Sequence, residues 1–355
     1  MTNALITGWG MYAPSRVMTN DELATIVDTN DEWIRTRTGI RERRIAADDE
    51  TALTLSVHAS RDALAVAGFD PKELDLVVVA TCTPDYPLPA TAVLVATELG
   101  ATRASGFDLQ AACSGFLYAM ATANGFIAGG MARNVLVIGV EVLSRFLDWT
   151  DRSTCVLFGD GAGAVVLQAS DQPGGALGFD LFSDGTGCEG IIMPAGGSAR
   201  PASHETVDAR MHAIRMLGSE VYKYATRQMG ESAVAALQRA GLTVDDIDQF
   251  VFHQANIRII NNVQKQLGIP EDKTYVNIER YGNTSAASVP MALVEAVASG
   301  RVKQGDRILM VAFGAGYTAG AAVWEWTADP ARAFLAPGDQ TRMGQPMRSL
   351  EGVGA

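Results

Sequence analysis

The sequence has few cysteines, little basic charge and no long apolar run. Its four cysteines among 355 residues (Cys82, Cys113, Cys155 and Cys188) show no Cys-x-x-Cys spacing, which argues against a zinc site or a disulfide framework. The net charge of −12 argues against nucleic acid as a partner. No apolar run reaches the length of a membrane span, and the first residues lack the basic segment of a signal peptide. We therefore expect a cytoplasmic protein without membrane contact.

What the sequence does contain is a series of short apolar runs. Residues 74–81, 134–142 and 307–314 are continuous apolar stretches, typical of parallel strands that are buried on both faces. Between them lie helical patterns such as 51–67, which ends at a glycine. A further capped helix is expected over 20–28, with Asn20 as its N-cap. The fold class is therefore α/β, with helices covering both faces of each sheet.

An internal repeat divides the chain. Residues 67–75 resemble 240–248 at an offset of 173, and the same offset takes the apolar run 134–141 onto 307–314. We expect a pseudo-duplicated fold in five layers, αβαβα, in which Cys113 falls opposite Asn283. The expected parts are an N-terminal half (1–170), an excursion loop rich in Gly, Pro and Asp (171–205), a C-terminal half (206–326) and a tail (327–355).

Cys113 stands between a predicted strand (104–109) and an Ala-rich helix (116–127). A helix N-terminus favours a thiolate, and its free N–H groups can hold an oxyanion. Cys113 is therefore a candidate nucleophile. Taken alone, it could equally be one more buried small side chain.

Two other polar residues occupy unusual settings. His253 ends an apolar strand (249–253), where α/β proteins place ligand chemistry, and Asn283 forms a Gly-Asn turn before a helix of small residues. Singly, His253 could be a satisfied core histidine and Asn283 a helix N-cap. The repeat, however, brings Asn283 to Cys113, which favours one shared site.

Four motifs carry a resemblance to a known family. Ala112-Cys113-Ser114-Gly115-Phe116, His253-Gln254-Ala255-Asn256, Gly282-Asn283-Thr284-Ser285-Ala286-Ala287-Ser288 and Phe313-Gly314-Ala315-Gly316 resemble the thiolase-fold condensing enzymes. Within them, the chain is similar to the β-ketoacyl-acyl carrier protein synthase III family over about residues 5–326. The resemblance implies initiation of fatty acid biosynthesis by decarboxylative condensation of an acyl-CoA primer with malonyl-acyl carrier protein.

The resemblance also assigns the chemical roles. Cys113 becomes the acylated nucleophile, and His253 and Asn283 donate hydrogen bonds to the malonyl thioester carbonyl as CO2 leaves. The backbone N–H groups of Cys113 and Ala315 form the oxyanion hole. No metal and no cofactor beyond the CoA thioester substrate are expected.

Binding residues follow from the same match. The implied CoA contacts are Thr29, Trp33, Arg37, Arg152, Met216, Gly218, Tyr222, Asn256 and Phe313. The implied carrier-protein contacts are Gln254, Ala255, Asn256, Ile257, Arg258, Lys223 and Lys265. Phe158 and Leu88 are expected at the primer pocket, with Leu88 reaching across the interface of a homodimer.

Three alternatives remain at this point. The order Cys, His, Asn also occurs in papain-like proteases, although their Cys-Gly-Ser-Cys-Trp neighbourhood is missing here. A starter-unit condensing or acyl-transfer enzyme of a polyketide or quinolone pathway would share both fold and triad. The third alternative is a non-catalytic homologue that binds acyl-CoA.

Overall fold

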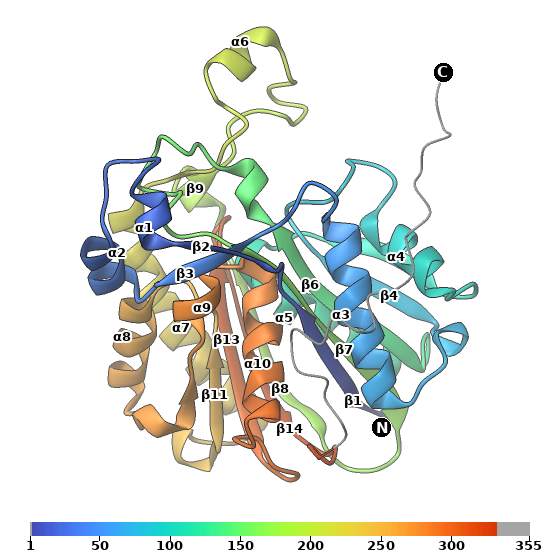
Figure 1. The fold of residues 1–355 in the computed structure, drawn as a ribbon. Coiled ribbons are helices and arrows are strands. Elements are labelled where there is room, and N and C mark those ends of the chain that lie inside the picture. The colour runs from blue at the N-terminus through green and yellow to red at the C-terminus, as the bar shows by residue number, and fades with distance from the viewer. Residues whose placement is uncertain (1, 332–355) are drawn as a thin grey trace.

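The computed structural model describes residues 2–331 and shows a mixed α/β molecule built on two five-stranded sheets (Figure 1). Within that range no helix has both the length and the apolar character needed to cross a membrane. Residues 332–355, most of the predicted tail, lie outside the described part of the chain.

The first sheet has the strand order β1-β7-β6-β4-β5. Its strands are β1 (Asn3–Tyr12), β7 (Asp160–Ser170), β6 (Asn134–Val142), β4 (Leu76–Ala80) and β5 (Ser105–Leu109). β4 runs parallel to both β5 and β6, whereas β7 is antiparallel to its neighbours β6 and β1. All five residues of β4 are buried, as its continuous apolar sequence predicts.

The second sheet has the order β12-β11-β13-β14-β8. Its strands are β12 (Thr274–Tyr275), β11 (Gln249–Phe252), β13 (Arg307–Gly314), β14 (Thr318–Glu325) and β8 (Gly175–Ser183). β11 is parallel to β12 and β13, and β14 is antiparallel to β13 and β8. The two sheets thus repeat one pattern of parallel and antiparallel pairs.

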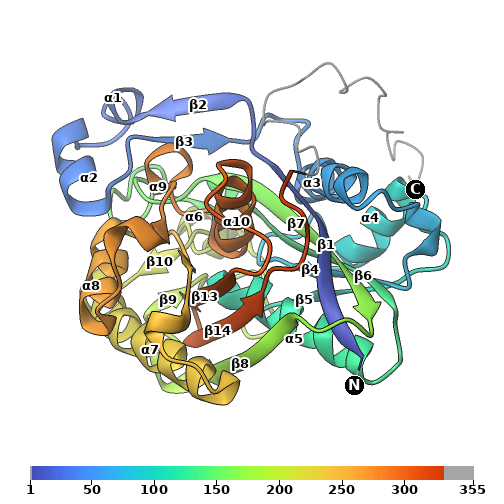
Figure 2. The same cartoon turned by 90° about the horizontal axis from the view of Figure 1, so that it is seen from below.

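Helices complete the layers, as Figure 2 shows from below. α5 (Gly115–Ala128) and α10 (Ser288–Ala298) lie between the sheets. α3 (Ala52–Ala67) and α4 (Thr91–Leu99) cover the outer face of the first sheet, and α7 (Gly218–Ala240) and α8 (Ile257–Leu267) that of the second. Residues 288–297 of α10 are all buried, because a central helix meets protein on every side. The predicted five-layer fold is confirmed.

Local sequence explains the ends of α3. The Thr51 hydroxyl accepts the Thr54 N–H and the Thr54 hydroxyl accepts the Thr51 N–H, which forms a capping box at the first turn. Gly68 ends the helix with φ +64°, a conformation that glycine adopts without steric cost. The helix expected over 51–67 is therefore confirmed almost to the residue.

Smaller elements surround this frame. They are β2 (Arg16–Thr19), α1 (Asn20–Leu23), α2 (Asp31–Thr38), β3 (Glu42–Ile45), β9 (Ile191–Ile192), α6 (His204–Asp208), β10 (Arg215–Met216) and α9 (Ile278–Tyr281). α6 stands on an arm above the rest of the molecule (Figure 1). Between α6 and α7 the chain is not helical and includes the short strand β10.

Two predictions about local structure are wrong. The segment 171–205 is not a loop throughout, since β8 within it pairs with β14 and forms an edge of the second sheet. The glycines of this segment obscure the strand pattern in the sequence. The segment is nevertheless a strand, because its backbone pairs with β14. The N-cap of α1 is Thr19, whose hydroxyl accepts the Glu22 N–H. Asn20 is buried instead and donates to the Ile40 carbonyl.

The repeat has a different register around the site from the one expected. Ala112 and Ser285 stand 173 residues apart, and both have φ +47°. Each opens a 3₁₀ turn (Ala112–Ser114 and Ser285–Ala287) that leads into a central helix. The offset therefore does not slip, and Cys113 corresponds to Ala286 instead of Asn283. Asn283 still reaches the same site, because it lies three residues before the equivalent of Cys113.

Candidate active site

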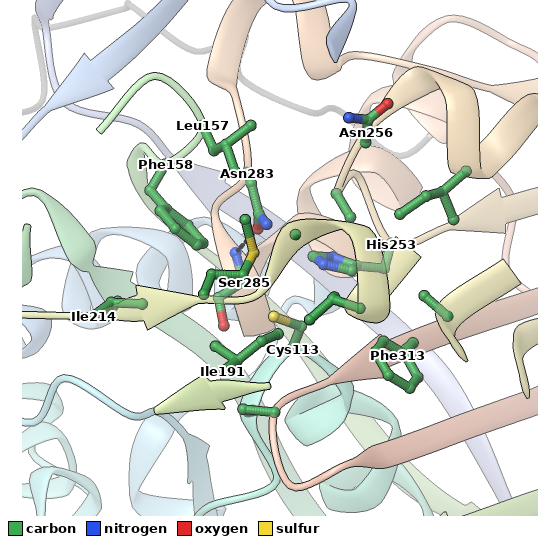
Figure 3. A pocket seen from close by; sticks show the side chains of 18 of the residues that line it. Cys113, Leu157, Phe158, Ile191, Ile214, His253, Asn256, Asn283, Ser285 and Phe313 are labelled. Atoms are coloured by element: carbon green, nitrogen blue, oxygen red, sulfur yellow. Dashed lines mark hydrogen bonds between the residues drawn. The ribbon is translucent and has the colours of Figure 1, made fainter. Parts of the chain in front are cut away.

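A cavity of about 730 Å³ lies where the two halves of the chain meet, and its lining is mainly apolar. Cys113, His253 and Asn283 all face it (Figure 3). The structure thus brings the predicted triad together from three separate places: the turn after β5, the end of β11 and the turn before α10.

Close backbone contact positions Cys113. Gly314, at the end of β13, packs so tightly that a Cβ there would lie 2.5 Å from the Cys113 backbone nitrogen. Ala315 follows and also lines the cavity. The backbone N–H groups of Cys113 and Ala315 are therefore on neighbouring segments, where the oxyanion hole is predicted.

The electrostatic setting of Cys113 differs from the expectation. Burial raises the pKa of its thiol to about 12; the Ser285 hydroxyl partly counters this effect, and Glu141 adds to it. Desolvation therefore opposes the thiolate that a helix N-terminus favours, and we expect a protonated thiol in the resting site. The thiol must lose its proton as it attacks.

His253 is a neutral donor in this site. Its Nδ1 lies 2.5 Å from the Ser288 hydroxyl oxygen, which also accepts the Gln254 N–H at 3.4 Å. A serine hydroxyl can accept from the backbone and still donate its own proton, and we assign that proton to Nδ1, which leaves the Nε2–H free to donate into the cavity. Burial lowers the pKa of His253 to about 3, so the ring stays neutral at ordinary pH.

Asn283 is oriented by its own turn. Its Oδ1 accepts the Ser285 N–H at 2.8 Å, and its backbone N–H donates to the Leu157 carbonyl at 2.8 Å. With Oδ1 occupied, the side-chain NH2 group is the end available to a ligand. His253 and Asn283 therefore present two uncharged donors, which is the arrangement that a developing enolate requires.

Most of the predicted CoA contacts lie on this cavity. Six of the nine line it: Arg37, Met216, Gly218, Tyr222, Asn256 and Phe313. Trp33 is half-buried beside two guanidinium groups, with Arg37 Cζ 4.7 Å and Arg152 Cζ 5.4 Å from its ring centre. The Thr29 hydroxyl oxygen is buried without a hydrogen-bond partner.

The predicted carrier-protein residues divide into two groups. Lys223, Arg258 and Lys265 are exposed, and the first two also line the cavity. Gln254 is 1% exposed, and its Oε1 accepts the N–H groups of Asn277 and Ile278. A surface contact through the Gln254 side chain is therefore a wrong prediction. Ala255, Asn256 and Ile257 are half-buried at the start of α8, where the Asn256 Oδ1 accepts the Arg258 N–H.

The two predicted primer-pocket residues behave differently. Phe158 lines the cavity together with Leu143, Leu157, Ile191 and Ile214. Leu88 is 82% exposed and is not among the residues that line its own chain's cavity. Its role across a dimer interface stays a prediction.

Three residues near the site were missed from the sequence: Ser285, Ser288 and Glu141. The Glu141 carboxylate is fully buried and accepts hydrogen bonds from the Thr83 hydroxyl at 2.7 Å, the Cys82 N–H at 3.1 Å and the Ser285 hydroxyl at 3.1 Å. Burial raises its pKa to about 7, against the effect of these bonds. A lone acid in the otherwise apolar run 134–142 was the signal that could have revealed it.

The fold and the site together define a thiolase-fold condensing enzyme: a duplicated five-layer α/β molecule with a cysteine and two neutral donors in one apolar cavity. Family models described as 3-oxoacyl-[acyl-carrier-protein] synthase III match residues 107–185, and those of its C-terminal part match 237–326. The chain belongs to the β-ketoacyl-acyl carrier protein synthase III family.

Individual relatives support this assignment. The chain is 55% identical to the β-ketoacyl-[acyl-carrier-protein] synthase III of Desulfitobacterium hafniense over 92% of this chain and 99% of that protein. It is similar to the solved structure of 3-oxoacyl-[acyl-carrier-protein] synthase III from Aquifex aeolicus, at 46% identity and a TM-score of 0.84, covering 92% and 100% of the two chains. The priming β-ketosynthase of the R1128 polyketide pathway is 43% identical, with a TM-score of 0.85 and coverage of 92% and 97%.

Proposed function

We propose that this protein condenses an acyl-CoA primer with malonyl-acyl carrier protein and so initiates fatty acid biosynthesis. The observation that carries the proposal is the juxtaposition of the Cys113 thiol with the neutral donors of His253 and Asn283 in one apolar cavity. The relatives are named β-ketoacyl- or 3-oxoacyl-[acyl-carrier-protein] synthase III, which matches the product of this reaction.

In the first half-reaction, the Cys113 sulfur attacks the thioester carbonyl of the acyl-CoA. A bond forms between this sulfur and the acyl carbon, and the CoA thiolate leaves. The backbone N–H groups of Cys113 and Ala315 stabilise the oxyanion of the intermediate. The apolar walls of the cavity suit the acyl chain, since each buried methylene contributes about 0.8 kcal/mol.

In the second half-reaction, malonyl-acyl carrier protein enters and loses CO2. His253 Nε2–H and the Asn283 NH2 group hold the thioester oxygen, where the enolate charge develops. Neutral donors suit this step, because a carboxylate in their place would repel the enolate. The carbanion then attacks the Cys113 thioester, which yields the β-ketoacyl product on the carrier protein and frees the thiol.

The binding assignments follow the same scheme. We propose that the CoA adenine is held between Trp33 and Arg152, and that Arg258, Lys265 and Lys223 attract the acidic carrier protein. We further propose a homodimer in the cytoplasm, and a reaction that uses the CoA thioester without a metal or another cofactor.

The alternatives are weaker. A papain-like protease does not fit the duplicated five-layer fold, and a non-catalytic homologue leaves the complete triad unexplained. A polyketide starter enzyme shares the fold, but the solved polyketide enzyme is 43% identical, whereas the synthase III of Aquifex aeolicus is 46% and that of Desulfitobacterium hafniense 55% identical. Primary fatty acid synthesis is therefore the function we propose.

Separating the half-reactions tests the proposal. Cys113→Ser should not form an acyl-enzyme, as seen by intact mass spectrometry after exposure to a panel of acyl-CoAs. His253→Ala and Asn283→Ala should still acylate but decarboxylate malonyl-acyl carrier protein about 10²–10³-fold more slowly, since each lacks one transition-state donor. If His253→Ala blocks acylation as completely as Cys113→Ser, His253 is instead the base that activates the thiol.

A further inference from the structure

The proposed mechanism leaves the proton of the Cys113 thiol without an acceptor. Its pKa is about 12, so the thiol is protonated when the substrate arrives. His253 is a poor base, because burial lowers its pKa to about 3. The proton therefore has to reach another group within the site.

Glu141 is connected to Cys113 through one hydroxyl group. The Ser285 hydroxyl lies 3.1 Å from Glu141 Oε1, and its side chain lies beside the Cys113 thiol, whose pKa it lowers (Figure 3). A carboxylate can only accept, so the Ser285 proton points to Glu141. The Ser285 oxygen is then left to accept from the Cys113 S–H.

Ser285 is held firmly in this bridging position. Its backbone N–H donates to Asn283 Oδ1 at 2.8 Å, and its φ of +47° is fixed within a buried turn. Glu141 is held as firmly, by the Thr83 hydroxyl and the Cys82 N–H on the loop after β4. The line from thiol to hydroxyl to carboxylate is therefore a built feature of the site.

We propose that Glu141, acting through the Ser285 hydroxyl, takes the proton of the Cys113 thiol during acylation and returns it during condensation. The inference rests on the proposed function only for the identity of the acyl donor. The proton path itself depends only on the side chains of Cys113, Ser285 and Glu141.

The steps balance as follows. As the Cys113 sulfur attacks the acyl carbon, its proton passes to the Ser285 oxygen while the Ser285 proton passes to Glu141. The CoA thiolate leaves and takes a proton from solvent. When the carbanion later attacks the acyl-enzyme, the departing Cys113 thiolate recovers its proton from Glu141 by the reverse path. One solvent proton is consumed per turnover, as the loss of CO2 and the release of CoA require.

The charge balance of the site supports the relay. A pKa of about 7 matches Glu141 to a base that works near neutral pH. The titratable groups facing it are the thiols of Cys82 and Cys113. On β7, Gly161 is its partner in the strand pairing, and the neighbouring Asp160 carboxylate binds Ser144 and Ala46 instead. With its proton, Glu141 is neutral when the malonyl carboxylate enters, which removes a repulsion.

The first test is the pH dependence of acylation, followed by quenched-flow release of CoA. In the wild-type protein the rate should rise with pH around a midpoint of about 7, because the carboxylate form accepts the proton. Glu141→Gln should abolish this midpoint and slow acylation at pH 7.5 by about 10²-fold or more. Glu141→Asp should keep a midpoint, whereas Thr83→Val, which removes one donor to the carboxylate, should shift it upward.

The second test uses iodoacetamide and needs no acyl donor. If Glu141 only placed a negative charge near Cys113, Glu141→Gln would ease thiolate formation and speed alkylation at pH 7.5. The relay predicts slower alkylation in Glu141→Gln and in Ser285→Ala. Faster alkylation of Glu141→Gln overturns the relay. If that variant does not fold, unchanged alkylation of Ser285→Ala overturns it instead. A relay seen with iodoacetamide but no acylation by any acyl-CoA would refute the proposed function alone.

Discussion

Removing the Ser288 hydroxyl should slow decarboxylation and leave acylation intact. In the structure this hydroxyl lies 2.5 Å from His253 Nδ1. With its proton assigned to Nδ1, it favours the tautomer whose Nε2–H points into the cavity. In Ser288→Ala the ring keeps its place directly after β11, but the hydroxyl that favours this tautomer is gone. A fraction of the protein then presents an acceptor where the malonyl thioester oxygen needs a donor.

The size of the effect follows from the single bond that is lost. One hydrogen bond contributes about 0.5–1.5 kcal/mol, which corresponds to about a 2- to 13-fold slower decarboxylation. His253→Ala removes the donor altogether and should cost about 10²–10³-fold. Since Ser288 acts only through His253, the double variant should match His253→Ala within about twofold.

The assay is CO2 release from malonyl-acyl carrier protein, beside acyl-enzyme formation by intact mass spectrometry. Equal loss of both half-reactions in Ser288→Ala would refute the reasoning, because it would show a general distortion of the site. Additive effects in the double variant would do the same, since Ser288 would then act by a route that does not pass through His253.

Three other predictions concern stability, partner binding and primer length. Because the folded-state pKa of Glu141 is raised from 4.5 to about 7, its ionisation destabilises the fold as pH rises through this range. In urea unfolding, the free energy of unfolding of Glu141→Gln should rise relative to wild type by up to about 3 kcal/mol between pH 5 and 8. A difference that does not change with pH would contradict the burial argument. Charge reversal at the exposed Arg258 and Lys265 should slow condensation and weaken its salt dependence, with acylation by acyl-CoA as the unaffected control; equal loss in both would point to misfolding. Leu88→Phe should shift acylation toward acetyl-CoA and Leu88→Gly toward longer primers, measured on a chain-length series, and an unchanged profile in both active variants would remove Leu88 from the pocket.

Patterns that are local in the sequence predicted most of the frame. The continuous apolar run of β4, the capping box of α3 and the glycine that ends it each act over a few residues, so they hold whatever the rest of the chain does. The repeat at an offset of 173 added the two-fold relation of the halves. The motifs around Cys113, His253 and Asn283 were enough to place these three residues at one site.

Long-range contacts decided what the sequence alone could not. β8 is a strand because β14 offers it a partner, and Asn20 is buried because Ile40 and Arg43 meet it there. None of these partners is near the segment it contacts in the sequence. A pattern read along the chain therefore misassigned both segments.

The charge states in the site depend on tertiary structure in the same way. A helix N-terminus is visible in sequence and predicted a thiolate at Cys113, but the thiol's pKa is set mainly by how much water the folded chain excludes. The contact between Glu141 and Ser285 joins residues 144 positions apart. The sequence by itself thus singled out Cys113, His253 and Asn283, whereas only the tertiary structure revealed Glu141, Ser285 and Ser288 around them, because desolvation and hydrogen bonding arise when distant segments pack together.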